Sequence, residues 1–337
     1  MKGIVCEQVD KLKLIELPEP PYAAGEAIVR IRRIGICGTD LHAYKGNQPF
    51  FTYPRVLGHE LAGTVERIGP NDAGLREGDQ VSIIPYMHCG SCIACRNGKT
   101  NCCTGMKVLG VHIDGGMRER ISVPVTHLIK TDGLTLDQTA VLEPLAIGAH
   151  AVRRSGVQIG ETALVIGGGP IGLGVMAFAK YACARVIAMD INDERLAFSK
   201  SWANADYTVN ALQNAKEQLA AITGGDFPTV VFDATGNAKS MENSFELTAH
   251  GGKLVYVGLV KGDITFHDPE FHKRELTLMS SRNATREDFD HVMEAVGNGD
   301  IDVQRYITHR SSFEDMIGKF DSWMRPESKV IKAIVEL

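Results

Sequence analysis

The sequence predicts an α/β protein of two domains, in which an irregular β domain accompanies a doubly wound parallel sheet. Three observations support this prediction. The chain has 337 residues, more than a typical single domain contains. Its first third is divided into short strand-like segments by Gly and Pro turns. From about residue 163 onward, strand-like and helical segments alternate, as is typical of a parallel sheet covered by helices.

The composition excludes several classes of protein. Hydrophobic residues make up 44% and charged residues 23% of the chain, so a large core can form and disorder is excluded. The net charge of −5 argues against a nucleic-acid partner, because such proteins present a basic surface. The longest uncharged stretch, residues 162–179, is too short to span a membrane and holds five glycines and Pro170. With Glu7 placed before any apolar signal region, we expect a cytoplasmic protein.

The segments of the β domain follow one another within the first 130 or so residues. They alternate apolar with polar positions or are rich in branched apolar residues, and we expect strands at residues 27–36, 61–68, 80–84 and 120–123. The final part of the chain predicts helices at residues 287–296 and 313–323 and a strand at residues 330–335. We assign residues 1–148 and 286–337 to this domain, which we expect to be the catalytic one, with a small lobe at about residues 86–105.

The second domain, residues 149–285, contains the alternating segments. Strands are predicted at residues 163–166, 185–190, 206–209, 229–233, 253–258 and 276–280. Helices are predicted after residue 170, at residues 193–202, where the first turn is acidic, and at residues 213–222 and 238–247. A doubly wound parallel sheet accounts for this order.

A glycine-rich turn follows the first strand of that sheet. Gly167, Gly169 and Gly172 have the G-x-G-x-x-G spacing, with Pro170 and Ile171 between the last two. Glycine is needed there for a tight turn, for close approach of a pyrophosphate and for helix–strand packing. The helix that follows directs its N-terminal amides at the phosphates. The turn therefore predicts a dinucleotide-binding (Rossmann) site.

Asp190 ends the next predicted strand, 18 residues after the last glycine of the turn. A carboxylate there accepts hydrogen bonds from the adenosine ribose hydroxyls and repels a 2′-phosphate, so we expect NAD rather than NADP. Arg195 lies close enough to complicate this preference, and it either contacts the adenine face or is solvated. We also expect Val257 and Gly258 to contact the cofactor.

Five of the eight cysteines fall between residues 89 and 103. Cys89, Cys92 and Cys95 are spaced C-x2-C-x2-C, and either Cys102 or Cys103 supplies a fourth thiolate. Four thiolates from one loop suit a closed, tetrahedral structural zinc site, and the acidic net charge argues against a nucleic-acid-binding zinc ribbon. A disulfide set is not expected in the cytosol.

A second group of metal-binding residue types lies earlier in the chain. Cys37 follows a predicted strand, and His59 and Glu60 open another. Three protein ligands and an open position describe a catalytic zinc site. Each residue alone is more often a buried thiol, a core histidine or a surface acid. Together with a dinucleotide fold downstream, they indicate a zinc dehydrogenase.

With these motifs in order along it, the whole chain resembles the zinc-dependent medium-chain alcohol dehydrogenases. Residues 58–69 read GHELAGTVERIG and match the family signature G-H-E-x2-G-x5-G. The resemblance implies a GroES-like catalytic domain with Cys37 and His59 as catalytic zinc ligands, and it selects Cys103 as the fourth structural ligand. It implies two zinc ions per subunit, and a homodimer or homotetramer.

The sequence departs from the ethanol-type branch of this family near the start of the cofactor domain. That branch has a cysteine ligand there, whereas this chain reads Leu142-Glu143-Pro144-Leu145. Glu143 and Glu60 resemble the polyol branch, which includes sorbitol and threonine dehydrogenases. The resemblance implies that either glutamate binds the zinc, directly or through a water molecule.

The family resemblance also implies a mechanism. Zinc holds the substrate hydroxyl and lowers its pKa, and hydride passes to the nicotinamide. We expect Thr39 to take the proton and relay it through the cofactor ribose to His42, which titrates near physiological pH. Asp40 is expected to cap the local backbone. A non-enzymatic NAD-binding zinc protein is the alternative, but it predicts losses among these residues, and none is missing.

Several segments outside the general signature, among them residues 46–51, 268–273 and 281–285, resemble the bacterial L-galactonate 5-dehydrogenases. The substrate is then a sugar acid or a polyol, with L-threonine or another alcohol as the alternative. A sugar acid needs a cationic partner, and Arg282 after the predicted strand 276–280 is the candidate. Its alternative role is to order the backbone or a glutamate of the zinc site. Phe50 and Phe51 either wall the pocket or anchor their loop.

Overall fold

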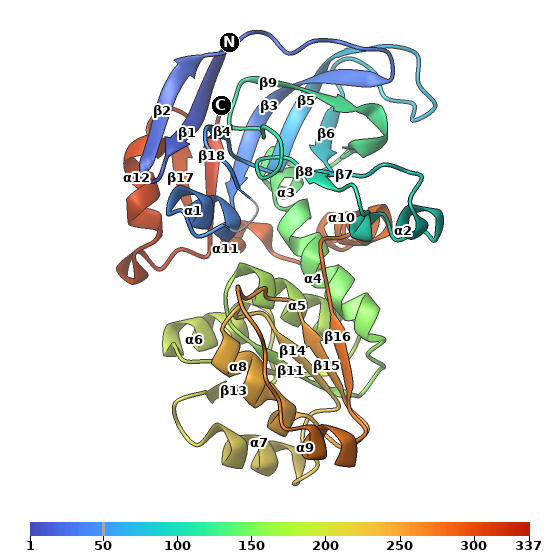
Figure 1. The fold of residues 1–337 in the computed structure, drawn as a ribbon, viewed down its shortest axis with the longest axis vertical. Coiled ribbons are helices and arrows are strands. Elements are labelled where there is room, and N and C mark those ends of the chain that lie inside the picture. Colours follow the sequence, from blue (N-terminus) through green and yellow to red (C-terminus); the bar gives the residue numbers. More distant parts are fainter. Residues whose placement is uncertain (49–50) are drawn as a thin grey trace. The chain divides into compact units, whose positions relative to one another are not determined.

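The computed structural model describes residues 1–48 and 51–337, and the chain forms two compact units. The first unit joins Met1–Glu143 to Met293–Leu337, and the second is Pro144–Val292 (Figure 1). In the described part of the chain, no helix combines the length and the apolar character that crossing a membrane requires.

Antiparallel strands dominate the first unit. Its main sheet has the order β10-β6-β5-β3-β18-β17, with β9 also paired to β3. These strands are β3 (Glu26–Ile36), β5 (Glu60–Ile68), β6 (Gln80–Ile83), β9 (Arg120–Pro124), β10 (Leu128–Lys130), β17 (Ile307–Ser312) and β18 (Lys332–Glu336). A smaller sheet contains β1 (Lys2–Gln8), β2 (Lys11–Glu16) and β4 (Arg55–Val56), and a two-stranded ribbon contains β7 (Tyr86–Met87) and β8 (Lys107–Val108).

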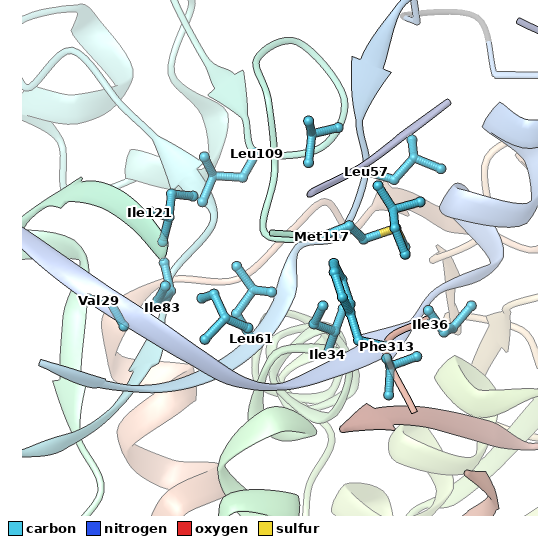
Figure 2. Packing of buried hydrophobic residues seen from close by; sticks show 14 of the residues in the cluster. Val29, Ile34, Ile36, Leu57, Leu61, Ile83, Leu109, Met117, Ile121 and Phe313 are labelled. Atoms are coloured by element: carbon cyan, nitrogen blue, oxygen red, sulfur yellow. The ribbon is translucent and has the colours of Figure 1, made fainter. Parts of the chain in front are cut away.

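Part of the core of this unit lies between the main sheet and the loop that follows β8. Figure 2 shows apolar side chains of β3, β5, β6 and β9 meeting Leu109 and Met117 of that loop. Phe313, from the C-terminal part of the chain, joins the same cluster. Burial of large apolar side chains stabilises the fold by about 1.5–3 kcal/mol each. This packing fixes the ends of β3 and β5, which carry the candidate metal ligands.

Short helices complete the first unit. They are α1 (Gly38–Tyr44), α2 (Ile93–Arg96), α3 (Leu136–Ala140), α11 (Val303–Tyr306) and α12 (Met316–Trp323), together with 3-10 turns at Thr100–Cys102, Val125–His127 and Pro326–Ser328. Thr135 caps α3 through a capping box with Gln138, so the sequence itself specifies where this helix begins.

All six strands of the second unit run parallel, in the order β13-β12-β11-β14-β15-β16. They are β11 (Thr162–Ile166), β12 (Arg185–Asp190), β13 (Tyr207–Asn210), β14 (Val230–Asp233), β15 (Lys253–Tyr256) and β16 (Thr277–Ser280). The connecting helices are α4 (Leu142–Ser155), α5 (Pro170–Tyr181), α6 (Asp193–Trp202), α7 (Ala215–Thr223), α8 (Ala238–Asn243) and α9 (Asp268–Lys273), with a 3-10 turn at Ser244–Leu247, and α10 (Arg286–Gly297) follows. The predicted α/β class with a doubly wound sheet is confirmed.

The structure also differs from the predicted elements. The hairpin β1–β2 and the long helix α4 were not predicted. The predicted helix 238–247 is a short α-helix followed by a 3-10 turn, because Ser244 and Thr248 donate their hydroxyls to backbone carbonyls at its end. The predicted helix 313–323 begins only at Met316.

A buried carboxylate joins α4 to the start of α10. Asp288 is 1% exposed, and its oxygens accept from His150 Nδ1 at 2.9 Å and from Arg153 Nε at 2.7 Å. The Thr285 backbone N–H donates to the same carboxylate at 2.8 Å. Burial alone would raise the pKa of Asp288, but His150 and Arg153 outweigh it and hold that pKa well below its ordinary value.

We expect Asp288→Ala to lower the free energy of unfolding at pH 7 by about 3 kcal/mol. The substitution removes the acceptor of the hydrogen bonds donated by His150, Arg153 and the Thr285 N–H. Because the Asp288 pKa falls on folding, its stabilisation is complete above the unfolded value near 4 and is lost as pH falls toward the folded value. Urea unfolding between pH 3 and 7 measures this, with the exposed Asp290→Ala as the control on the same helix. A pH-independent difference between Asp288→Ala and wild type would contradict the assignment.

Candidate functional site

Strand register brings Cys37, His59 and Glu60 together in the first unit. β3 pairs antiparallel with β5 so that Gly35 lies opposite Glu60, and Cys37 follows as the N-cap of α1. One donor atom from each of the three residues lies within 4.8 Å of the other two. His59 is 5% and Glu60 0% exposed. A Cβ on Gly35 would lie 2.0 Å from Glu60 Oε2, so only glycine leaves room for this carboxylate.

Asp40 links the two turns that carry these side chains. It accepts from the backbone N–H of Cys37 at 3.0 Å and from that of Gly58 at 3.1 Å, which is the capping role expected for it. Its Oδ1 lies 3.6 Å from His59 Nδ1, too far for a hydrogen bond. Burial works against a charged His59, yet Asp40 and Cys37 raise the pKa of His59 well above its ordinary value. Asp40 therefore lies on the Nδ1 side of the imidazole and favours its charged form.

Lys332 of β18 forms a buried ion pair with Glu60. Its Nζ donates to Oε1 at 2.6 Å, to Oε2 at 2.7 Å and to the Ile36 carbonyl at 3.2 Å. Lys332 is 1% exposed. Burial lowers its pKa, but the Glu60 carboxylate outweighs this effect and the pKa is raised, so Lys332 stays charged. Sequence reasoning missed Lys332, and the signal available was a lysine inside the otherwise apolar predicted strand 330–335.

Glu143 lies in the first turn of α4 and is 2% exposed. Tyr86 donates its hydroxyl to Oε1, while Oε2 is buried without a hydrogen-bond partner among the described residues. Burial raises the pKa of Glu143 to about 7, with His59 opposing and Glu60 adding to the shift. Glu143 lies outside the set of three residues whose donor atoms are within 4.8 Å of one another. Its charge is nevertheless coupled to His59.

These residues fit a zinc ion. A cysteine sulfur, a histidine nitrogen and carboxylate oxygens are all ordinary zinc donors. Among the described residues, Glu143 Oε2 is buried and has no hydrogen-bond partner, although buried polar atoms are normally satisfied. Three protein ligands with a further carboxylate nearby match a catalytic rather than a closed structural site.

The cysteine lobe forms a second compact set. Cys89, Cys92, Cys95 and Cys103 have donor atoms within 4.8 Å of one another, and the pairs Cys89–Cys103 and Cys92–Cys95 are 3.5 Å apart at sulfur. Four sulfurs bound to one zinc at about 2.3 Å would lie roughly 3.8 Å apart, so the set fits. The Cys95 backbone N–H helps to lower the pKa of Cys92 to about 5, which favours the thiolate that binds metal. The alternative ligand, Cys102, is exposed and outside this set.

The expected relay residues lie on α1, beside Cys37. Thr39 is half-buried and His42 exposed, and their i,i+3 spacing places them on one helix face. Phe51 packs edge-to-face on Tyr53 with ring centroids 4.9 Å apart and contacts the core, as a loop anchor would. Phe50 lies outside the described residues.

The glycine-rich turn joins β11 to α5 in the second unit. Gly167 has φ +103°, and a Cβ on Gly172 would lie 1.7 Å from the Gly167 carbonyl oxygen, so both positions require glycine. Gly169 is the N-cap of α5 and Pro170 opens that helix, ahead of Ile171. The first turn of α5 therefore presents free backbone amides beside the turn, as a phosphate site needs.

Asp190 ends β12 and binds the turn itself. Its Oδ2 accepts from the Gly168 N–H at 2.6 Å and its Oδ1 from the Asn192 N–H at 2.9 Å. Arg195, in the first turn of α6, packs close to Gly168. The next residue after Asp190, Ile191, is 64% exposed.

The remaining expected cofactor and substrate residues follow two other strands of the same sheet. Val257 and Gly258 follow β15, and their N–H groups donate to the Asp233 carbonyl at 2.9 Å. Arg282 follows β16 and is exposed. These residues share the carboxyl edge of the sheet with Asp190 and the glycine turn, and ligands collect at this edge in doubly wound folds.

Comparison with known proteins identifies two family domains in the chain. Residues 23–133 match the alcohol dehydrogenase GroES-like domain, and residues 170–298 match the zinc-binding dehydrogenase domain. Both matches agree with the order of motifs described above.

Named relatives extend over nearly the whole chain. An L-galactonate-5-dehydrogenase of Escherichia coli is 43% identical over 337 residues, covering 99% of this chain and 98% of that protein. A 2-dehydro-3-deoxy-L-galactonate 5-dehydrogenase of Pseudoalteromonas atlantica is 32% identical, covering 93% of this chain and 92% of that protein. An L-idonate 5-dehydrogenase of Vitis vinifera is 33% identical, with coverage of 90% and 86%.

Solved structures of dehydrogenases are similar to this chain over its whole length. An alcohol dehydrogenase of Escherichia coli CFT073, solved with NADH, superimposes with a TM-score of 0.93 at 30% identity, covering 100% of this chain and 99% of that one. A zinc-binding dehydrogenase of Sinorhizobium meliloti with NADP gives 0.91 at 26% identity, with coverage of 100% and 99%. The chain therefore belongs to the zinc-binding alcohol dehydrogenase family, and it is an oxidoreductase that acts on CH–OH donors.

Proposed function

We propose that this chain is an NAD-dependent dehydrogenase that oxidises a secondary hydroxyl of a six-carbon sugar acid, with L-galactonate as the model substrate. The observation that carries the proposal is the set of relatives. At 43%, 32% and 33% identity, three of them are named as 5-dehydrogenases of L-galactonate, its 2-dehydro-3-deoxy derivative and L-idonate. All three names specify an acid and the same hydroxyl position.

Cys37, His59 and one or both of Glu60 and Glu143 would hold the catalytic zinc, and the four cysteines of the lobe would hold the structural one. Zinc bound by these residues would supply a positive charge that lowers the pKa of a substrate hydroxyl. Asp40 orients His59 from behind, and Lys332 holds both oxygens of Glu60. Glu60 therefore reaches a metal only by exchanging part of its ion pair, whereas Glu143 already has an oxygen without a partner.

Thr39 would receive the hydroxyl proton, and His42 would pass it to solvent. His42 suits the last step because its imidazole is exposed and a histidine side chain can both accept and donate a proton. Asp190 would accept the adenosine ribose hydroxyls of NAD while keeping the glycine turn in place. Arg282 would meet the substrate carboxylate.

We further propose a cytoplasmic homodimer or homotetramer. A polyol or L-threonine as substrate is the alternative that the same site chemistry allows.

The zinc assignment predicts two zinc ions per chain. Cys37→Ser should lose one zinc and nearly all turnover while keeping the thermal unfolding temperature close to wild type, because only the open site is affected. Cys92→Ser should lose the other zinc and lower that temperature, since structural zinc contributes folding free energy. Elemental analysis, kinetics and calorimetry measure this, with the exposed Cys183→Ser as the control. One zinc or none in carefully prepared wild type would refute the assignment.

The cofactor assignment predicts that Asp190→Ser shifts preference from NAD toward NADP. A buried, charge-assisted hydrogen bond is worth roughly 1.5–3 kcal/mol, so NAD affinity should fall on the order of ten- to a hundredfold. Affinity for both cofactors should fall in part, because Asp190 also holds Gly168. The informative quantity is the ratio of kcat/KM for NAD to that for NADP, compared with the exposed Asp193→Ser. An unchanged ratio would mean that another residue selects the cofactor.

The substrate assignment predicts NAD reduction with aldonates in a screen that also contains hexitols, pentitols and L-threonine. We expect kcat/KM to be highest for L-galactonate or a close stereoisomer. A preference for a polyol or L-threonine would favour the alternative substrate, and inactivity on every class with zinc bound would exclude the proposal.

Arg282→Ala should lower kcat/KM for an aldonate at least tenfold more than for the matched polyol, because a guanidinium–carboxylate pair is lost. Arg286→Ala, four residues along and paired with Asp290, is the control. Equal losses on both substrates would indicate a structural arginine, and no loss would remove Arg282 from the site.

A further inference from the structure

Tyr86 contacts the metal site without supplying a zinc ligand. It belongs to β7 and is 3% exposed. Its hydroxyl donates to Glu143 Oε1, 57 residues along the chain. A phenol is a poor zinc donor beside the cysteine, histidine and carboxylates already present, so the hydroxyl acts on Glu143 rather than on a metal.

The backbone of Tyr86 is held on several sides. β7 pairs with β8 through Tyr86↔Val108 and Met87↔Lys107, and the Leu109 N–H donates to the Pro85 carbonyl at 3.0 Å. His127 Nε2 lies 3.2 Å from the Tyr86 carbonyl oxygen. The β7–β8 ribbon closes the base of the loop that carries Cys89, Cys92, Cys95 and Cys103. The position of the Tyr86 hydroxyl is therefore set by the folded cysteine lobe.

After the cysteine lobe, the chain continues into a loop that packs against the backbone just before His59. The Gly116 N–H donates to the Gly58 carbonyl at 2.8 Å, and the Met117 N–H donates to the Leu57 carbonyl at 2.9 Å, directly before His59. The segment from Tyr86 to Met117 therefore begins at the contact with Glu143, includes the cysteine lobe and ends against the backbone that precedes His59.

Glu143 has one oxygen held and one without a hydrogen-bond partner among the described residues. A hydrogen bond to one oxygen of a carboxylate fixes the direction of the other. Partners that orient a metal ligand in this way typically change metal affinity or activity by 10- to 100-fold when they are removed.

We propose that Tyr86 is a positioning residue of the catalytic zinc site, which orients Glu143 so that Oε2 serves the metal or its bound water, and that it transmits the order of the cysteine lobe to that site. This inference rests on the proposed function and takes Glu143 as a glutamate that, with Cys37 and His59, would hold the catalytic zinc. It adds a residue to the site and a reason for the lobe to lie where it does.

The test compares the Tyr86→Phe holoenzyme with wild type. The ring is kept and only the hydroxyl is removed. Release of zinc to excess EDTA should show two phases in wild type, and Cys37→Ser identifies the phase that belongs to the catalytic site. In Tyr86→Phe that phase should accelerate by about 10- to 100-fold and kcat should fall by a similar factor, while the cysteine-lobe phase stays within twofold. Tyr44→Phe, which loses a hydroxyl bonded to Asp321 and the Asp10 carbonyl, is the matched control.

A Tyr86→Phe variant with wild-type zinc release and kcat would overturn the inference. Equal acceleration of both phases together with a lowered unfolding temperature would also overturn it, because that result describes a general loss of structure. A wild-type protein without the Cys37-dependent phase would refute the proposed function and the inference with it, so the two failures are distinguishable.

Discussion

The structure of the first unit depends on charge compensation in a buried cluster. Asp40, Glu60 and Glu143 are all at most 2% exposed, and an ionised carboxylate costs several kcal/mol to bury without a partner. Lys332 compensates Glu60, and two backbone amides and His59 compensate Asp40, but among the described residues Glu143 receives a hydrogen bond only from the Tyr86 hydroxyl. Together with the Cys37 thiol, the cluster has more acceptors than cations. A divalent metal ion completes this balance, and zinc matches the donor types.

Strand pairing positions the candidate site residues in both units. Pairing of β3 with β5 sets Cys37 against His59 and Glu60, and pairing of β18 with β3 brings in Lys332. In the other unit, the carboxyl edge of a parallel sheet gathers residues from separate strands around the glycine turn. Asp190 has two roles. In our proposal its carboxylate selects the cofactor, and the same carboxylate accepts a hydrogen bond from the Gly168 N–H.

The parts of the site that could be predicted from sequence were local in the chain. The cysteine spacing, the glycine turn and the GHE segment each place chemically distinctive residues within a few positions of one another. Lys332 and Tyr86 could not be found in this way, because their partners lie 272 and 57 residues away and come close only in the folded chain. Helix α4 was missed because Pro144 near its start and Gly148 at its middle weaken the local helix signal, while burial of its apolar face stabilises it.

The central claim, that buried negative groups in the first unit are completed by zinc, is tested most directly by anomalous diffraction. Data from crystals of the holoprotein, recorded on both sides of the zinc absorption edge, locate each zinc ion without assumptions about ligands. We predict one peak among the sulfurs of Cys89, Cys92, Cys95 and Cys103 and a second peak bounded by Cys37 and His59, with a glutamate oxygen or its water beside it. A single peak in the cysteine lobe, with ordered water alone between Cys37 and His59, would contradict the account.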